Sequence, residues 1–315
     1  MNSKRKILIT DSVHPLLYEG LRADGFMVDY LPDITALQVA EVIAAYEGLV
    51  INSKVYAGNE LFNKAPLLKF VCRAGSGLEV IDIEYAKQKG IAAFNSPEGN
   101  RNAVAEHALG MLLCLLNNIV KANTEVKSGQ WNREENRGTE LAGKTIGLMA
   151  YGNTAEAFAK LLGSFDVRIL AYDKYRKNFA NEHVKEASPQ EIAREADVLS
   201  LHLPLTPETE YMIDYAFLSS FKKKFWLLNT SRGKVLRTAH LIKCINEGRI
   251  YGAALDVLEN EKLQTLNEEE QDIFQKLAAD KRILLTPHIA GWTHESKQKI
   301  AEILLQKIRA LYQAI

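Results

Sequence analysis

The chain of 315 residues carries 39 basic and 39 acidic residues, so its formal net charge at pH 7 is zero. This length allows two domains of ordinary size, each with its own core. The balanced charge, without a run of Lys or Arg, argues against binding to nucleic acid or to a membrane surface and favours a small-molecule ligand.

Short β-rich runs alternate with helical patterns along the chain, which predicts parallel sheets. In the first series we expect strands at 6–10, 26–31, 48–52, 68–75 and 91–95, with helices at 14–24, 36–46 and 83–89. A long helix is expected after residue 100. The second series has strands at 145–150, 167–173, 197–204, 225–232, 250–257 and 282–288, each followed by a helix. Two wound α/β units follow.

The segment 103–120 is apolar on nearly every side. Glu106, His107 and the pair Asn117 and Asn118 keep its apolar run shorter than the roughly 20 residues of a membrane span. We therefore expect a buried helix between domains or subunits.

The cysteines favour a reducing compartment. The three of them, Cys72, Cys114 and Cys244, are far apart, form no C-x-x-C motif and lie in apolar segments. The first residues lead directly into an expected strand and lack the features of a secretory signal. We therefore expect a cytoplasmic protein.

The stretch TIGLMAYGNTAEAFAK at residues 145–160 predicts a buried strand, a turn and a helix. A dinucleotide turn has the pattern G-x-G-x-x-G, and this chain has Ala150, Gly152 and Ala155 at the three glycine positions. Gly152 keeps the close backbone approach to a pyrophosphate. Ala150 requires a negative φ, unless the turn stores strain. The alternative is a structural αβ crossover that merely contains a glycine.

An acidic residue supports the nucleotide interpretation. About 20 residues after the turn, the next expected strand ends in Asp173, where an NAD-binding domain places an acid on the ribose hydroxyls. Asp173 would repel a 2′-phosphate, so NAD is preferred, although Lys174 and Arg176 beside it leave NADP open.

Ionisable residues follow three further expected strands. Arg232 lies at the end of the expected strand segment 225–232 and His288 at the end of the last one. Asp256 lies near the end of the segment between them, with Glu259 and Glu261 just after it. Carboxyl ends of parallel strands lie at one edge of a sheet, where ligands gather. A histidine can exchange the hydroxyl proton of an alcohol, a carboxylate can orient its ring, and an arginine can bind a substrate carboxylate. Each residue alone could equally be structural or solvated.

The other histidines give weaker signals. His202 lies beside Pro204 without an acidic neighbour in the sequence, so we expect it at most to form part of a cofactor wall. The remaining histidines lack a metal-ligand pattern, and no metal is expected.

Seven segments together resemble the D-isomer-specific 2-hydroxyacid dehydrogenases, most closely the phosphoglycerate dehydrogenases. The segments are RAGSGLEVID, NSPEGN, GQWNREENRGTELAGKTIG, HLPLTPET, NTSRG, GAALDV and TPHIAGWT, and they occur in the order of that family. The resemblance implies a Rossmann-type NAD domain at 101–288, inserted in a flavodoxin-like substrate domain at 1–100 and 289–315. It also implies a homodimer formed through the cofactor domain, which would account for the apolar segment 103–120.

The resemblance assigns roles to individual residues. Arg232 matches the substrate arginine and His288 the acid-base histidine, and Glu261 rather than Glu259 matches the catalytic glutamate. We expect substrate contacts at Arg73, Gly75, Ser76 and Gly77. We expect cofactor contacts at Gly152, Asn153, Thr154, Asp173, His202, Pro204, Thr209, Thr230, Ser231, Asp256 and Gly291.

Three departures from the family pattern stand out. Ala150 replaces a glycine, Lys262 replaces a proline after the glutamate, and near Asn52 only Lys54 is available where phosphoglycerate dehydrogenases often have an arginine. A phosphate requires at least two cationic donors, for which the candidates are Lys54, Arg73, Arg101 and Arg137.

We therefore expect an NAD-dependent dehydrogenase of a small D-2-hydroxy acid, with 3-phosphoglycerate first and glyoxylate or hydroxypyruvate as the alternative. A corepressor-like scaffold that senses NAD(H) is the alternative of another class. The chain stops after its last expected helix, so no C-terminal regulatory module is expected.

Overall fold

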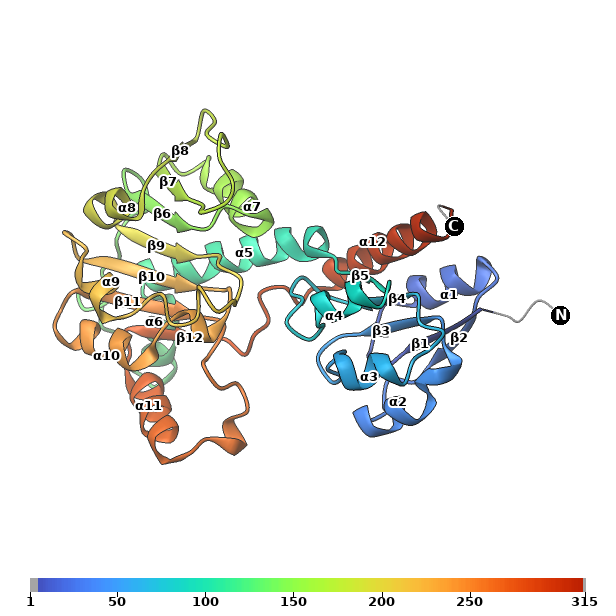
Figure 1. Cartoon of the computed structure of the whole chain (residues 1–315). Helices are drawn as coiled ribbons and strands as arrows, with labels where there is room; N and C mark the ends of the chain where they lie inside the picture. Colours follow the sequence, from blue (N-terminus) through green and yellow to red (C-terminus); the bar gives the residue numbers. More distant parts are fainter. Residues whose placement is uncertain (1–4, 314–315) are drawn as a thin grey trace. The chain divides into compact units, whose positions relative to one another are not determined.

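The computed structural model describes residues 5–313, which fold as two compact units (Figure 1). The terminal unit comprises Met1–Arg101 and Trp292–Ile315, and the central unit comprises Asn102–Gly291. The domain boundaries expected from the sequence lie close to these. The substrate-binding and dinucleotide-binding roles of the two domains stay predictions at this point.

The terminal unit contains a five-stranded parallel sheet in the order β2-β1-β3-β4-β5. Its strands are β1 (Lys6–Ile9), β2 (Met27–Tyr30), β3 (Gly48–Ile51), β4 (Phe70–Arg73) and β5 (Ala92–Phe94). Helices α1 (Pro15–Ala23) and α12 (His294–Gln313) pack on one face. The other face is covered by α2 (Ala36–Val42), the 3₁₀ turn η1 (Ile43–Ala45), α3 (Asn59–Asn63) and α4 (Ile83–Gln88). This strand order is that of flavodoxin, as expected.

The central unit contains seven parallel strands in the order β12-β11-β10-β9-β6-β7-β8. They are β6 (Thr145–Met149), β7 (Arg168–Tyr172), β8 (Val184–Glu186), β9 (Val198–Leu201), β10 (Phe225–Asn229), β11 (Ile250–Leu255) and β12 (Ile283–Leu285). The order is that of the Rossmann fold extended by one strand, with its reversal between β6 and β9. The predicted fold class is therefore confirmed.

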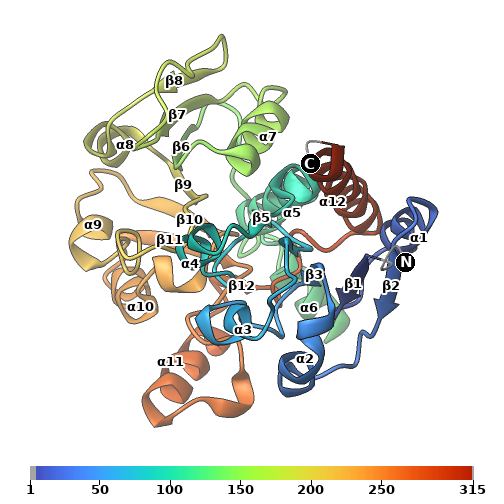
Figure 2. The same ribbon diagram turned by 45° about the vertical axis from the view of Figure 1, so that its right-hand side comes forward.

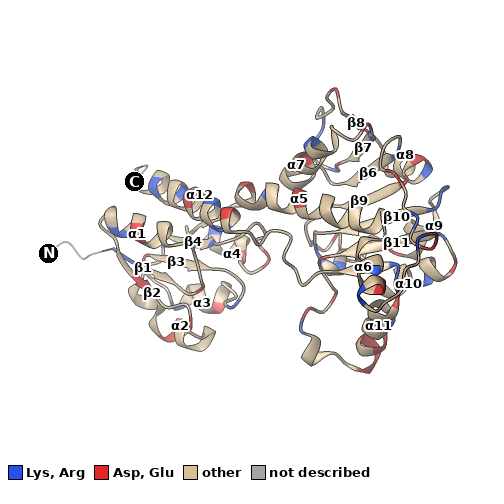
Figure 3. Ribbon diagram, turned by 180° about the vertical axis from the view of Figure 1, so that it is seen from behind, with Lys and Arg blue, Asp and Glu red and all other residues tan. Residues whose placement is uncertain are grey.

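Helices cover both faces of the central sheet (Figures 1 and 2). One face packs against α5 (Pro97–Leu116) and α7 (Asn153–Leu162). The other packs against α8 (Pro189–Glu195), α9 (Tyr215–Ser219), α10 (Thr238–Asn246) and α11 (Glu268–Ala279). The short turns η2 (Gly233–Val235) and η3 (Leu263–Thr265) follow β10 and β11. Acidic and basic residues are interspersed along both units, with an acidic group at the start of α11 (Figure 3).

The prediction of one helix over 103–120 is wrong in its bounds. Helix α5 begins earlier and ends at Leu116, and a second helix, α6 (Ile119–Lys127), follows. Asn118 between them has φ 52°, a left-handed conformation that asparagine tolerates better than most residues. Among residues 5–313, no single helix is long and apolar enough to span a membrane; α5 and α6 pass that test only together, and they are bent by 61°.

Candidate active site

The turn expected to bind a pyrophosphate follows the central strand β6. Ala150, the first residue of the turn, has φ 68°, so the left-handed conformation that favours glycine is occupied by an alanine. Such a conformation costs about 1–2 kcal/mol for a residue with a Cβ. Of the two possibilities left by the sequence, a negative φ or stored strain, the structure shows the second.

The rest of this turn fits a dinucleotide. Gly152 immediately precedes α7, and apart from its two chain neighbours no residue has an atom within 4 Å of the position that its Cβ would occupy. No side chain among the described residues caps α7 at Gly152. Helix N-terminal N–H groups without a capping side chain attract anions, and an open glycine lets a phosphate approach the backbone. Asn153 and Thr154 form the first turn of this helix.

Three strands end in register around this turn, because Met149 of β6 pairs with both Tyr172 of β7 and Leu201 of β9. Asp173 therefore lies next to the turn. Its carboxylate accepts hydrogen bonds from the N–H groups of Tyr151 (2.9 Å), Tyr175 (2.9 Å) and Arg176 (2.8 Å). Burial alone would raise the pKa of Asp173, but these backbone donors lower it below its usual value.

The cations near Asp173 are engaged with other groups. Lys174 forms an ion pair with Glu208 at 2.8 Å, and Arg176 forms one with Glu156 at 3.3 Å. The Arg176 guanidinium also lies 5.4 Å from the centre of the Tyr151 ring. These ion pairs are about half exposed, so they weaken, without cancelling, the attraction of the two cations for a 2′-phosphate.

His202 follows β9 and is buried. Its Nδ1 lies 3.2 Å from the Thr154 hydroxyl and its Nε2 lies 2.9 Å from the Ser200 hydroxyl. Burial lowers the pKa of His202 to about 4, so the imidazole is neutral near pH 7. His202 thus links β9 to α7 through its contacts with Ser200 and Thr154. Its expected contact with a cofactor stays a prediction.

The loop after His202 is closed by Thr209, whose hydroxyl donates to the Pro204 carbonyl at 2.6 Å. After β10, the hydroxyl of Ser231 donates to the Asn229 side chain at 2.8 Å. The buried Thr230 hydroxyl oxygen has no hydrogen-bond partner among the described residues. The cofactor contacts expected at Pro204, Thr209, Thr230 and Ser231 stay predictions.

The three candidate catalytic residues lie in the loops that follow β10, β11 and β12, at the carboxyl ends of these strands. Asn229, Leu255 and Leu285 pair across β10, β11 and β12, so these strands also end in register. His288 follows β12, and its Nδ1 lies 2.8 Å from Oε2 of Glu261. Both side chains are about half exposed, at 45% and 43%.

Glu259, the other candidate acid, points elsewhere. Its Oε1 accepts a hydrogen bond of 2.6 Å from the N–H of Thr238. Arg232 lies between β10 and η2, and its guanidinium donates to the Ser231 carbonyl at 2.7 Å. The next residue, Gly233, packs on the segment that leads to Glu261, because a Cβ on it would lie 1.8 Å from the Leu258 carbonyl oxygen. The catalytic roles of all these residues stay predictions.

Two residues that the sequence did not assign to catalysis support the loop of His288. The carboxylate of Asp256 is 1% exposed and accepts hydrogen bonds from the Thr286 hydroxyl (2.5 Å) and from the N–H groups of Ile289 and Ala290 (both 2.9 Å). His107 of α5 lies 3.1 Å from the same hydroxyl.

These contacts explain how His288 is held at φ 56°, with its own N–H donating to the Asp256 carbonyl at 2.8 Å. The cofactor contact expected at Asp256 stays a prediction. In the structure its carboxylate accepts hydrogen bonds from Thr286, Ile289 and Ala290. The sequence gives no sign of this role for His107, because its partner Thr286 lies 179 positions away.

The expected substrate loop follows β4 in the terminal unit. Arg73 forms an ion pair with Glu79 at 2.8 Å. The Ser76 hydroxyl donates to Asn100 at 2.5 Å, and the carbonyl of Gly75 accepts from the N–H of Ser96 at 2.9 Å. These contacts fix the loop, while substrate binding by Arg73, Gly75, Ser76 and Gly77 stays a prediction. No group of three or more His, Cys, Asp or Glu that could hold a metal occurs in residues 5–313.

Comparisons with known proteins add to this geometry. Residues 109–290, more than half of the chain, match the family described as D-isomer specific 2-hydroxyacid dehydrogenase, NAD binding domain. The chain belongs to this family. It is therefore an NAD-binding oxidoreductase, which confirms the resemblance seen in the sequence and disfavours the scaffold alternative.

Individual members of the D-2-hydroxyacid dehydrogenase family differ in substrate. Glyoxylate reductase of Pyrococcus furiosus is 36% identical over 88% of this chain and 83% of its own length. D-3-Phosphoglycerate dehydrogenase of Synechocystis is 30% identical over 96% of this chain, which spans about half (53%) of that protein. D-Lactate dehydrogenase of Aquifex aeolicus, solved with NAD and lactic acid, matches with a TM-score of 0.84 and 26% identity over 98% of this chain and 96% of that one.

Replacing Ala150 by glycine should stabilise the protein. Glycine adopts φ 68° without the Cβ clash, so we expect a gain of about 1 kcal/mol in the free energy of unfolding after the entropy cost of glycine. Urea unfolding measures this change. Ala155→Gly inside α7 is the control and should destabilise; a loss of stability in both variants would contradict strain at Ala150.

The buried His202 should make folding sensitive to acid. The unfolded imidazole takes up a proton near pH 6.5, whereas the folded one does so only at about pH 4. The contribution of His202 is therefore present above pH 6.5, and about 3 kcal/mol is lost as the pH falls to 4. The free energies of unfolding of the wild type and of His202→Gln should therefore approach each other as the pH is lowered from 7 to 4. Parallel curves would contradict this.

Proposed function

We propose that this enzyme reduces a short 2-keto acid with NADH, and oxidises the matching D-2-hydroxy acid with NAD. Glyoxylate or hydroxypyruvate is the favoured substrate, and 3-phosphoglycerate is the second candidate. The observation that carries the proposal is the 2.8 Å contact between His288 and Glu261, at the edge of the sheet from which Arg232 also emerges.

The chemistry follows from the atoms that remain available. Glu261 engages Nδ1 of His288, so Nε2 is the ring nitrogen that can exchange a proton with the substrate oxygen. Glu261 thereby fixes the orientation of the ring. Arg232 would pair with the substrate carboxylate, for which a planar guanidinium is suited. When bound, the nicotinamide supplies the hydride or accepts it.

The preference for a substrate without phosphate rests on the contacts that already engage the candidate phosphate-binding cations. Arg73 is paired with Glu79 at 2.8 Å, Arg137 is paired with Glu134 at 2.6 Å, and Lys54 donates to the Pro32 carbonyl. Three of the four cations considered for a phosphate are thus engaged within the chain. The similarity to glyoxylate reductase over most of that protein supports the same choice.

Coenzyme preference is inferred from Asp173. Its carboxylate stays charged, and the neighbouring Lys174 and Arg176 are paired with glutamates. A 2′-phosphate would meet this negative charge, and the cations around it are engaged with glutamates or, for Lys177, with the Asp173 carbonyl. We infer that NADH is preferred over NADPH.

We also propose that the enzyme is a homodimer formed through the central unit. Ile119, Val120, Val126 and Trp131 are 48–78% exposed, which is unusual for residues so apolar. Val120 also lines a groove of about 300 Å³ between α6, the end of α11 and β12. A second copy would cover this surface. The cytoplasmic location and the absence of nucleic-acid and membrane partners stay predictions.

The substrate proposal is tested by turnover. Purified protein with NADH should reduce glyoxylate and hydroxypyruvate faster than 3-phosphohydroxypyruvate, and NADPH should be a poorer donor. His288→Ala should lower kcat by about 10²–10⁴-fold, because proton transfer is lost, while NADH still binds. Absence of turnover across a panel of 2-keto and 2-hydroxy acids would refute the proposal.

The dimer is tested by light scattering. The wild type should have twice the chain mass of 35.3 kDa, and Val120→Glu should shift it toward the monomer. Leu37→Glu, at a residue 80% exposed in the terminal unit, is the control and should leave the dimer intact. A monomeric wild type would contradict the proposal.

A further inference from the structure

The position of the Glu261 carboxylate depends on the loop that carries it, and the ion pair with His288 does little to stabilise that loop. Glu261 and His288 are both about half exposed, and exposed ion pairs contribute only about 0–1 kcal/mol. Glu261 also lies outside any helix or strand, between β11 and η3. The 2.8 Å contact therefore requires a backbone that is fixed by other interactions.

Residues 258–260, which we call the strut, supply three such interactions. The first is a backbone contact, because Leu258 packs directly on Gly233, the residue after Arg232. A Cβ on Gly233 would lie 1.8 Å from the Leu258 carbonyl oxygen and 2.6 Å from the Glu259 nitrogen. The strut is thus in contact with the loop of Arg232 at one end and continues into Glu261 at the other.

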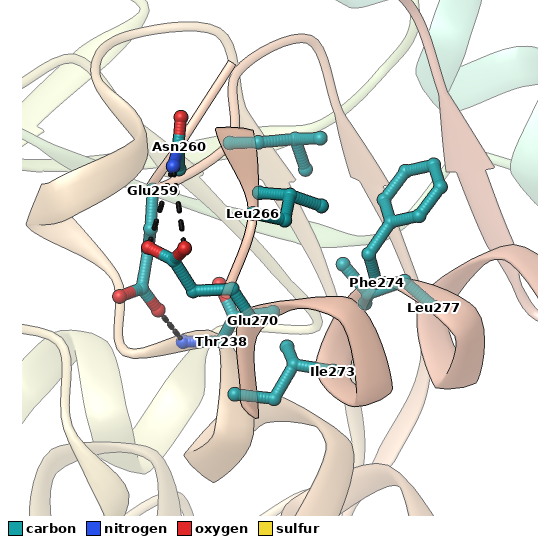
Figure 4. A pocket seen from close by; sticks show the side chains of 9 residues that line it. Thr238, Glu259, Asn260, Leu266, Glu270, Ile273, Phe274 and Leu277 are labelled. Atoms are coloured by element: carbon teal, nitrogen blue, oxygen red, sulfur yellow. Dashed lines mark hydrogen bonds between the residues drawn. The ribbon is translucent and has the colours of Figure 1, made fainter. Parts of the chain in front are cut away.

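The second interaction caps α10 from a distance. The residue that precedes α10, Arg237, provides no side-chain cap, and the Glu259 carboxylate accepts the N–H of Thr238 at 2.6 Å instead. A carboxylate at a helix N-terminus is stabilised both by this hydrogen bond and by the helix dipole. Glu259 thereby attaches the strut to the start of α10 (Figure 4).

The third interaction attaches the strut to α11. The side-chain amide of Asn260 donates to both carboxylate oxygens of Glu270, at 3.3 and 3.4 Å, as Figure 4 shows. The side-chain oxygen of Asn260, Oδ1, accepts a hydrogen bond from the N–H of Lys262 at 3.0 Å. Glu270 itself is held by the N–H of Asn267 at 2.9 Å. The Asn260 side chain therefore binds α11 through Glu270 and also closes a short turn around Glu261 through Lys262.

An apolar cavity of about 50 Å³ lies beside these bonds, lined among others by Leu266, Ile273 and Phe274. In Figure 4 these side chains lie on the α11 side of the strut, and the polar bonds lie at its edge. The strut is therefore incompletely packed on this side. The polar attachments at Glu259 and Asn260 fix its position together with the contact of Leu258 with Gly233.

We propose that Glu259 and the Asn260–Glu270 pair are positioning residues, which set the place of Glu261 against His288 and relative to Arg232. This inference rests on the proposed function, since that function gives Glu261 its role. The hydrogen bonds of these side chains go to Thr238, Glu270 and Lys262, so both act on Glu261 through the strut.

The test compares Glu259→Ala and Asn260→Ala with Glu261→Gln. Both alanine variants should lower kcat by about 10- to 100-fold, because a displacement of about 1 Å in a catalytic group has effects of this size. NADH affinity should stay within about twofold, since the residues of the turn before α7 are unchanged. The pH profile of kcat/KM should change in the same direction as in Glu261→Gln.

Two further variants serve as controls. Glu259→Gln retains an oxygen that can accept the N–H of Thr238 and should recover most of the activity. Glu269→Ala removes an equal charge from the exposed first turn of α11 without contact with the strut, and it should behave as the wild type.

The ring nitrogen signals of His288, measured by NMR, report on its contact with Glu261 without turnover. In Glu259→Ala and Asn260→Ala they should move toward those of Glu261→Gln. Unchanged signals, or a loss of kcat that only follows the loss of folded protein with an unchanged pH profile, would overturn the proposal. A wild type without turnover would refute the proposed function, while the NMR comparison would still decide on the strut.

Discussion

The site depends on the buried carboxylate of Asp256. It follows β11 and holds three hydrogen-bond donors that come from the end of β12 and the loop beyond it. Removing such a carboxylate would leave buried donors unsatisfied, and burying it unpaired would be costly. The loop of His288 therefore has one stable arrangement, which joins the last two strands of the sheet at their carboxyl ends.

Backbone strain occurs at two positions of functional interest, Ala150 and His288, with φ of 68° and 56°. Residues with side chains adopt this region rarely, and such strain persists only where the surroundings determine the conformation. At His288 the surroundings are the Asp256 hydrogen bonds. At Ala150 they are the N–H of Tyr151 bound by Asp173 and the Tyr151 ring, which is 2% exposed and stacks on Phe179.

Much of the fold could be predicted from the sequence, because buried parallel strands are long apolar runs separated by helical patterns. The strand β8 and the helix α3 were missed, since three and five residues are too short to show a period. The break between α5 and α6 was also missed, because an asparagine pair shows that an apolar run is interrupted and not that the backbone turns there. Strand order came from the resemblance and not from the alternation itself.

The site was predictable only where a residue follows a strand directly. Arg232, Asp173 and His288 could be found in this way, and the contact of Glu261 with His288 agrees with the family resemblance that selects it over Glu259. The supports of the site were not predictable. His107, Gly233 and Glu270 act over long distances in the sequence, and nothing in their local pattern distinguishes them from ordinary helix or loop residues.

The bond between Asp173 and the Tyr151 amide has a practical consequence for enzyme engineering. The carboxylate for which we propose a role in coenzyme preference also secures the turn before α7. Exchanging Asp173 for a neutral or basic residue, the usual route to a different coenzyme, would release that turn together with its left-handed alanine. A redesign of coenzyme choice in this chain therefore has to supply a new acceptor for the Tyr151 amide at the same time.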